Sequence, residues 1–68
     1  MNNFSKRLKE LRTEKNLSQQ ELAKEVGLTH TAIGLWELNK RTPNLDAVIK
    51  LAKFFKVSLD YLAGLEDL

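Results

Sequence analysis

The chain has 68 residues, of which 43% are hydrophobic, and it contains no cysteine, one histidine and one proline. A chain of this length forms one domain, and neither disulfides nor a dedicated zinc site can stabilise it. It has no apolar run of about 18 residues, and polar residues follow Met1, so we expect no membrane span, no signal peptide and a cytoplasmic location.

The net charge of +2 is distributed unevenly along the chain. Residues 1–41 carry eight Lys and Arg against five Glu, a balance of +3, and residues 42–68 carry three Lys against four Asp and Glu, a balance of −1. A basic first part suits a protein with one anionic partner surface, although an ordinary solvated surface rich in lysine explains the charge equally well.

The first predicted element is an amphipathic helix over residues 4–15. Phe4, Leu8 and Leu11 recur at positions i, i+4 and i+7 between charged residues, which is the spacing of one helix face. Asn16 supplies the turn that ends this helix.

Two short helices follow, over residues 19–26 and 30–38. Ser18-Gln-Gln-Glu21 is a capping box, in which the serine hydroxyl and the glutamate carboxylate each accept a hydrogen bond from a backbone N–H at the helix start. Gly27 can adopt the left-handed conformation that ends a helix, and Thr29 caps the next one. Apolar side chains hold the pair together, namely Leu22, Val26, Leu28, Ile33 and Trp36.

Two more helices are predicted after the segment 39–43, where Pro43 disfavours helical structure at the residue before it. Asn44 caps a fourth helix, and Ser58 caps a short fifth helix that stops at Gly64. The inward face of the fourth helix is predicted to contain Leu45, Val48, Ile49, Ala52 and Phe55. We therefore expect one all-α domain over residues 1–68, a compact five-helix bundle with a helix-turn-helix at about 19–38.

The paired helices and their glycine turn resemble the helix-turn-helix of the Cro/C1-type, phage-repressor family. The likeness covers nearly the whole chain, through residues 8–12, 17–23, 36–37, 43–46 and 51–62. It implies a lambda-repressor-like fold and a double-stranded DNA partner, with the second helix of the motif in the major groove and the first across the backbone.

By this resemblance, the base-reading residues are His30, Thr31, Gly34 and Leu35. The face that they form has no Arg, Asn or Gln, so the usual bidentate contacts to guanine or adenine are missing. We therefore expect DNA shape to contribute a larger share of the recognition. Each of these residues also fits an ordinary surface position, and Leu35 fits a protein contact.

The resemblance also assigns phosphate contacts to helix starts, which favour anions, and to the loop after the third helix. The residues concerned are Gln19, Thr29, Asn39 through its backbone, Lys40 and Arg41. The Gln19 side chain meets a phosphate or braces the recognition helix, and Asn39 replaces the glycine that is more usual there.

Two further expectations concern structure and assembly. Arg12 and Glu37 match an arginine and a glutamate that pair in family members, so we expect a partly buried ion pair that fixes the recognition helix.

Because a single module makes few DNA contacts, we expect a homodimer through the tail 58–68, unless this tail is a frayed end. The dimer residues would be Leu59, Tyr61, Leu65 and Leu68.

The predicted function is that of a sequence-specific repressor of prophage or mobile-element type, bound as a homodimer to an inverted-repeat operator. The alternatives on the same fold are an antitoxin, a restriction-modification controller and a protein-interaction module. An enzyme is not expected, because one histidine, no cysteine and no Gly-rich loop provide neither a nucleophile–base set nor a metal cluster. We expect no cofactor and no small-molecule substrate.

Overall fold

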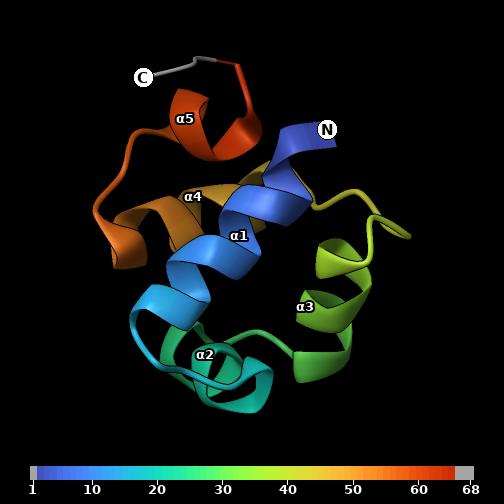
Figure 1. Cartoon of the computed structure of the whole chain (residues 1–68), viewed down its shortest axis with the longest axis vertical. Coiled ribbons are helices and arrows are strands. Elements are labelled where there is room, and N and C mark those ends of the chain that lie inside the picture. Colours follow the sequence, from blue (N-terminus) through green and yellow to red (C-terminus); the bar gives the residue numbers. More distant parts are fainter. Residues whose placement is uncertain (1, 66–68) are drawn as a thin grey trace.

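The computed structural model describes residues 2–65, and helices make up all the regular structure in this range. In Figure 1, α1 crosses the middle of the molecule in front of α4, with α5 above, α2 below and α3 at the right. The helices are α1 (Asn2–Glu14), α2 (Gln19–Val26), α3 (His30–Glu37), α4 (Leu45–Phe55) and α5 (Leu59–Ala63). The prediction of an all-α fold of five helices is confirmed for residues 2–65.

Local side-chain contacts set the ends of α2 and the start of α3. The backbone N–H of Glu21 donates to Ser18 Oγ at 3.0 Å, and the Ser18 N–H donates to the Glu21 carboxylate at 2.8 Å, so the predicted capping box is present. Gly27 ends α2 with φ 72°, a left-handed conformation that costs glycine little. Thr29 then caps α3 by accepting a hydrogen bond from the Ala32 N–H.

The later helices begin in the same way, with Asn44 capping α4 and Ser58 capping α5. Their ends differ in residue type. Gly64 ends α5 in the left-handed region at φ 85°, whereas α4 ends at Lys56, which adopts φ 57° although it carries a side chain. Left-handed backbone is strained for a residue with a Cβ, so the end of α4 is less favourable than the glycine ends of α2 and α5.

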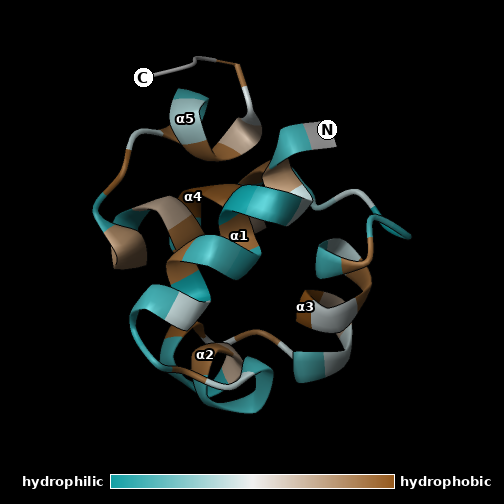
Figure 2. Ribbon diagram, viewed as in Figure 1, coloured by the Kyte–Doolittle hydropathy of each residue, from teal (hydrophilic) through white to brown (hydrophobic). Residues whose placement is uncertain are grey.

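All five helices contribute to the core, and Figure 2 shows α4 as largely hydrophobic and the outer surface of α1 as hydrophilic. The fully buried large side chains are Phe4, Leu8, Leu22, Ile33, Leu51 and Leu62. Phe4 packs edge-on against Trp36, with ring centroids 6.2 Å apart, which joins α1 directly to α3. Burial of Leu62 ties the short α5 to the rest of the molecule.

One predicted core position is wrong. Leu45 was expected on the inward face of α4, but 64% of it is exposed. Val48, Ala52 and Phe55 are buried as predicted, but the buried stripe of α4 also includes Ala47 and Leu51, so Leu45 lies beside it, at the helix start. Ile49 is half-buried for the same reason.

Candidate nucleic-acid interface

One side of α3 is buried in the core, and the other side forms an exposed outer face. Ile33 and Trp36 are buried, as their spacing predicts, while His30 and Thr31 in the first turn are exposed. Leu35, further along the outer face, is half-buried. Two hydrogen-bonding side chains and one apolar side chain are therefore available on one side of a short helix.

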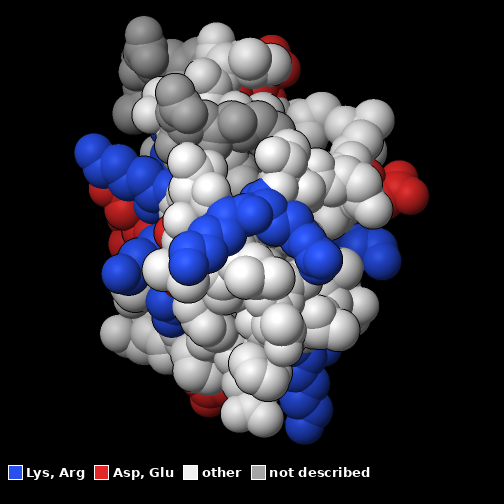
Figure 3. All heavy atoms as spheres, turned by 90° about the vertical axis from the view of Figure 1, so that its right-hand side faces the viewer, with Lys and Arg blue, Asp and Glu red and all other residues white. Residues whose placement is uncertain are grey.

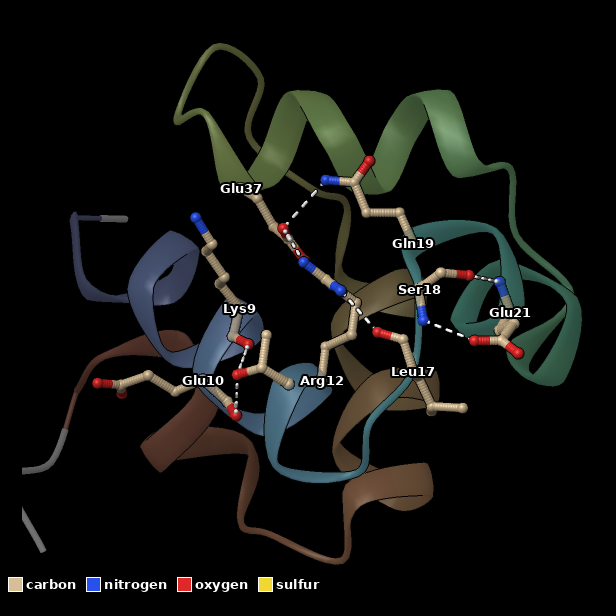
Figure 4. A network of polar contacts seen from close by, with 9 residues as sticks. Lys9, Glu10, Arg12, Leu17, Ser18, Gln19, Glu21 and Glu37 are labelled. Carbon is tan, nitrogen blue, oxygen red and sulfur yellow. Dashed lines mark hydrogen bonds and ion pairs between the residues drawn. The ribbon is translucent and has the colours of Figure 1, made fainter.

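The angle of α3 is fixed by a bidentate ion pair between Arg12 of α1 and Glu37 at the end of α3 (Figure 4). Arg12 Nε lies 2.7 Å from Glu37 Oε2, and Arg12 Nη2 lies 3.0 Å from Glu37 Oε1. The two side chains are only 12% and 4% exposed, so water screens the pair weakly. The hydrogen bond to Glu37 raises the pKa of the Arg12 guanidinium and outweighs the lowering effect of burial, while the attraction between the two charges adds to the rise.

Two further hydrogen bonds extend this pair into a network that we call the Glu37 network, formed by Arg12, Leu17, Gln19 and Glu37. Arg12 Nη1 donates to the Leu17 carbonyl at 2.6 Å, and Gln19 Nε2 donates to Glu37 Oε1 at 3.0 Å. The network thus joins α1, the segment before α2, α2 itself and the end of α3. Gln19 braces α3, one of the two roles expected of it.

Gln19 also lies against Gly34, in the middle of α3. A Cβ built on Gly34 would lie 3.2 Å from Gln19 Oε1, which is a tight contact. The sequence alone leaves Gly34 as a gap through which the backbone could approach DNA. In the structure, the amide group of Gln19 lies against this position.

The sequence analysis missed Ser5, which is 92% buried (8% exposed) on α1 and donates a hydrogen bond to the Trp36 carbonyl. Asn39 Oδ1 lies 3.4 Å from the same hydroxyl. Ser5 therefore ties the last turn of α3 to α1, as Arg12 does through Glu37. The only signal in the sequence is a serine directly after Phe4, on an otherwise apolar strip of the helix.

The loop after α3 begins with Asn39 in the left-handed conformation, at φ 59°. Its N–H donates to the Trp36 carbonyl at 3.0 Å, and the N–H of Lys40 donates to the Leu35 carbonyl at 2.9 Å. The backbone N–H of Asn39, which was expected to grip a phosphate, is already used to close the helix. Its side chain is what remains for such a contact.

The charge on this side of the molecule is positive. Lys40 and Arg41 are exposed, and the one acidic residue in the segment 27–44 is Glu37, which Arg12 neutralises. In Figure 3, which faces the α3 side, basic side chains cross the centre and acidic ones lie near the margins. The outer face of α3 therefore lies in a positive field, which suits an anionic partner.

The expected dimer residues lie at the other end of the chain. Leu59 is 37% exposed and Leu65 is 77% exposed. Tyr61 is half-buried, because the Arg7 guanidinium lies 4.3 Å from its ring centroid and also donates to the Tyr61 carbonyl. Leu68 lies outside the described residues. This end offers two exposed leucines and one aromatic ring that is partly covered.

Within residues 2–65, no helix is both long and apolar enough to cross a membrane.

Comparison with known proteins gives a match to the helix-turn-helix family over residues 8–62. The HTH-type transcriptional activator BcrR of Enterococcus faecalis is 42% identical over 65 residues, which is 96% of this chain and 32% of BcrR. The SPbeta prophage-derived uncharacterized HTH-type transcriptional regulator YonR of Bacillus subtilis is 41% identical over 87% of this chain and 55% of its own length. The cryptic phage CTXphi transcriptional repressor RstR of Vibrio cholerae is 36% identical over 90% of this chain and 55% of its own length.

The chain thus spans between about a third and just over a half of these curated relatives. All three are regulators of transcription by name. The family match covers the paired helices, the loop with Lys40 and Arg41, and the core of α4 and α5. With its resemblance to the Cro/C1 type carried by the same residues, the chain belongs to the helix-turn-helix family.

Proposed function

We propose that this protein binds double-stranded DNA sequence-specifically in the cytoplasm, with α3 in the major groove. The observation that carries the proposal is the outer face of α3, which has no acidic side chain and is held at a fixed angle by the Glu37 network. An α-helix fits the major groove, where each base pair displays a distinct set of donors, acceptors and methyl groups. His30 and Thr31 would hydrogen-bond to base edges, and Leu35 would cover a thymine methyl.

Flanking phosphates would be bound by groups around this face. The starts of α2 and α3, at Gln19 and Thr29, offer helix N-termini, where backbone N–H groups and the helix dipole favour an anion. Lys40, Arg41 and the side chain of Asn39 would bind the same DNA strand further along. These contacts would supply affinity and orientation without sequence preference.

We further propose that the protein acts as a homodimer on an inverted-repeat operator and represses transcription. One module would bury roughly 600–1,000 Å² of protein surface on DNA, and two modules related by two-fold symmetry would read half-sites about one helical turn apart. Exposure of Leu59 and Leu65, with Tyr61 beside them, supports a dimer surface at the C-terminal end. A phage repressor among the relatives supports repression, although another relative is an activator by name.

A second candidate is a protein-interaction module that keeps the fold without binding DNA. The observation in its favour is Leu38, which is 65% exposed at the end of α3. The variant Leu35→Arg separates the two, because a new cation on the outer face should strengthen or redirect duplex binding. A protein-interaction module would gain no duplex preference from this change.

The test is selection from a pool of randomised duplexes at near-physiological salt, followed by sequencing of what the protein retains. Paired, inverted half-sites about one helical turn apart are the expected result. The matched control is the variant with His30→Ala and Thr31→Ala, which should keep the fold and low-salt binding but lose the enrichment. Binding at low salt without enrichment by the wild type would contradict sequence-specific recognition.

A further inference from the structure

We propose that Gln19 of α2 reads a base edge alongside α3, and that Gly34 is the residue that makes room for it. The ligand class is a base with an exocyclic amino group in the major groove, adenine N6 or cytosine N4. The inference rests on the proposed function and assigns Gln19 a role in specificity beyond its phosphate contact and its bracing of α3.

The first observation is that Gly34 lies on the outer face of α3 but is not open. His30 and Leu38 lie one turn before and one turn after it on the same face, and both are exposed. Gly34 between them is half-buried, because the Gln19 amide covers it. A Cβ on Gly34 would lie 3.2 Å from Gln19 Oε1 and 3.8 Å from Cδ and Nε2. The absence of a side chain at residue 34 thus lets the amide lie this close to α3 without a tight contact.

The second observation is that the amide is held in one orientation. A carboxylate only accepts hydrogen bonds, so Gln19 must turn its NH₂ group toward Glu37, where Nε2 lies 3.0 Å from Oε1. Glu37 is itself held by two hydrogen bonds from Arg12 (Figure 4). Gln19 Oε1 consequently lies on the Gly34 side, and no hydrogen bond to it is formed by the residues that the structure describes.

The third observation concerns what α3 lacks. His30, Thr31, Gly34 and Leu35 include no amide or guanidinium, which are the groups that contact adenine or guanine in a bidentate way. Gln19 supplies an amide from the neighbouring helix, with a free acceptor and a second Nε2 hydrogen. An acceptor next to a donor is what an adenine edge requires, and the acceptor alone suffices for the cytosine amino group.

A purely structural role for Gln19 makes a different prediction. If Gln19 only braces α3 through Glu37, its loss weakens binding to every DNA sequence by the same factor. If it reads a base, its loss removes the preference at one position of each half-site and leaves the preferences at other positions. The measurement must therefore compare base preferences, not affinities alone.

The experiment measures the affinities of the full chain for the selected operator and for each of its single base-pair substitutions. The wild type should prefer A or C at one position of each half-site by roughly 5- to 150-fold, the range that one good base contact provides. The variant Gln19→Ala should lose the preference at that position and keep the preferences at all other positions. The control Gln20→Ala removes the exposed neighbouring amide and should keep every preference. Retention of every base preference by Gln19→Ala, with uniformly weaker binding, would overturn the proposal.

The variant Gly34→Ala gives an independent test that leaves all hydrogen-bonding groups in place. Its new Cβ would lie 3.2 Å from Gln19 Oε1 and require that oxygen to shift slightly, while alanine favours the helix and so preserves the fold. A reduced preference at the same base position as in Gln19→Ala supports the proposal, and an unchanged preference contradicts the role of Gly34. A wild type without any base preference would overturn the proposed function itself.

Discussion

Glu37 is the residue on which the geometry of α3 depends most. Its carboxylate, with 4% of the side chain exposed, accepts two hydrogen bonds from Arg12 and one from Gln19. Burying a charge is unfavourable unless partners replace the lost water, and here they do. Removing either member of the ion pair leaves the other charge in a site that excludes water.

The variant Glu37→Ala is therefore expected to lower the free energy of unfolding by about 3–5 kcal/mol. A domain of 68 residues has roughly 3–10 kcal/mol in total, so this variant loses a large share of its stability, and we expect it to lose DNA binding through misfolding. Thermal unfolding followed by circular dichroism measures the effect. The double variant Arg12→Met with Glu37→Met is the control, because it removes both charges and should retain much more stability. A Glu37→Ala protein that melts like the wild type yet does not bind would show a direct role in binding instead.

At the scale of the elements, helix ends differ in how well their residues suit the backbone. α2 and α5 end on glycines in the left-handed region, whereas α4 ends on Lys56 at φ 57°. Glycine adopts this conformation without the contact between Cβ and the carbonyl oxygen that strains other residues.

We expect Lys56→Gly to raise the free energy of unfolding by about 1 kcal/mol, because it relieves this strain. The matched control is Lys53→Gly, an exposed lysine inside α4, which should lower stability by about 1 kcal/mol through loss of helix propensity. Urea unfolding midpoints of both variants give the comparison. A Lys56→Gly variant less stable than the wild type would mean that the lysine side chain stabilises this end by more than the backbone strain costs.

The sequence predicts the helix ends well because a cap involves residues three or four positions apart, as between Ser18 and Glu21. The sequence predicts burial less well at the start of a helix, because it does not fix there which side of the helix faces the core. Leu45 was predicted to be buried for this reason. Contacts between distant segments leave no periodic signal. The place of Gln19 over Gly34 and the burial of Ser5 therefore emerged only from the structure, and the pairing of Arg12 with Glu37 was expected only from the family resemblance.

For the whole molecule, the distribution of charge predicts how DNA binding responds to salt. Each Lys or Arg that neutralises a phosphate releases counterions, so the slope of log K against log salt concentration reports the number of such contacts. Lys40 and Arg41 are exposed beside the outer face of α3, whereas Lys53 lies on α4.

Lys40→Ala and Arg41→Ala should each weaken binding to all duplexes alike and reduce the magnitude of the salt slope by about 1. The measurement is a titration of the selected operator and of a scrambled duplex at several salt concentrations. Lys53→Ala serves as the control and should leave the slope unchanged. A loss confined to the selected operator would instead assign the mutated residue to base recognition.

The proposed dimer makes a second prediction at this scale. Leu65→Glu places a charge on the exposed C-terminal end, where Leu65 is 77% exposed, and should weaken self-association at least tenfold without altering the fold. Sedimentation equilibrium measures the association constant. Leu38→Glu, at the end of α3 and similarly exposed, should leave self-association unchanged. The reverse pattern would move the dimer surface to α3.

The contacts that orient α3 come from its inner side and its last turn, through Ser5, Arg12 and the core, and not from the side chains of its outer face. The fold should therefore tolerate substitution at His30, Thr31 and Leu35. A library of variants randomised at these three positions should consist mostly of folded proteins. Position 34 is the exception, since a Cβ there would lie 3.2 Å from Gln19 Oε1 and require the Gln19 side chain to shift. New specificities could accordingly be obtained by exchanging three side chains on a constant frame, both in the laboratory and during the divergence of such regulators.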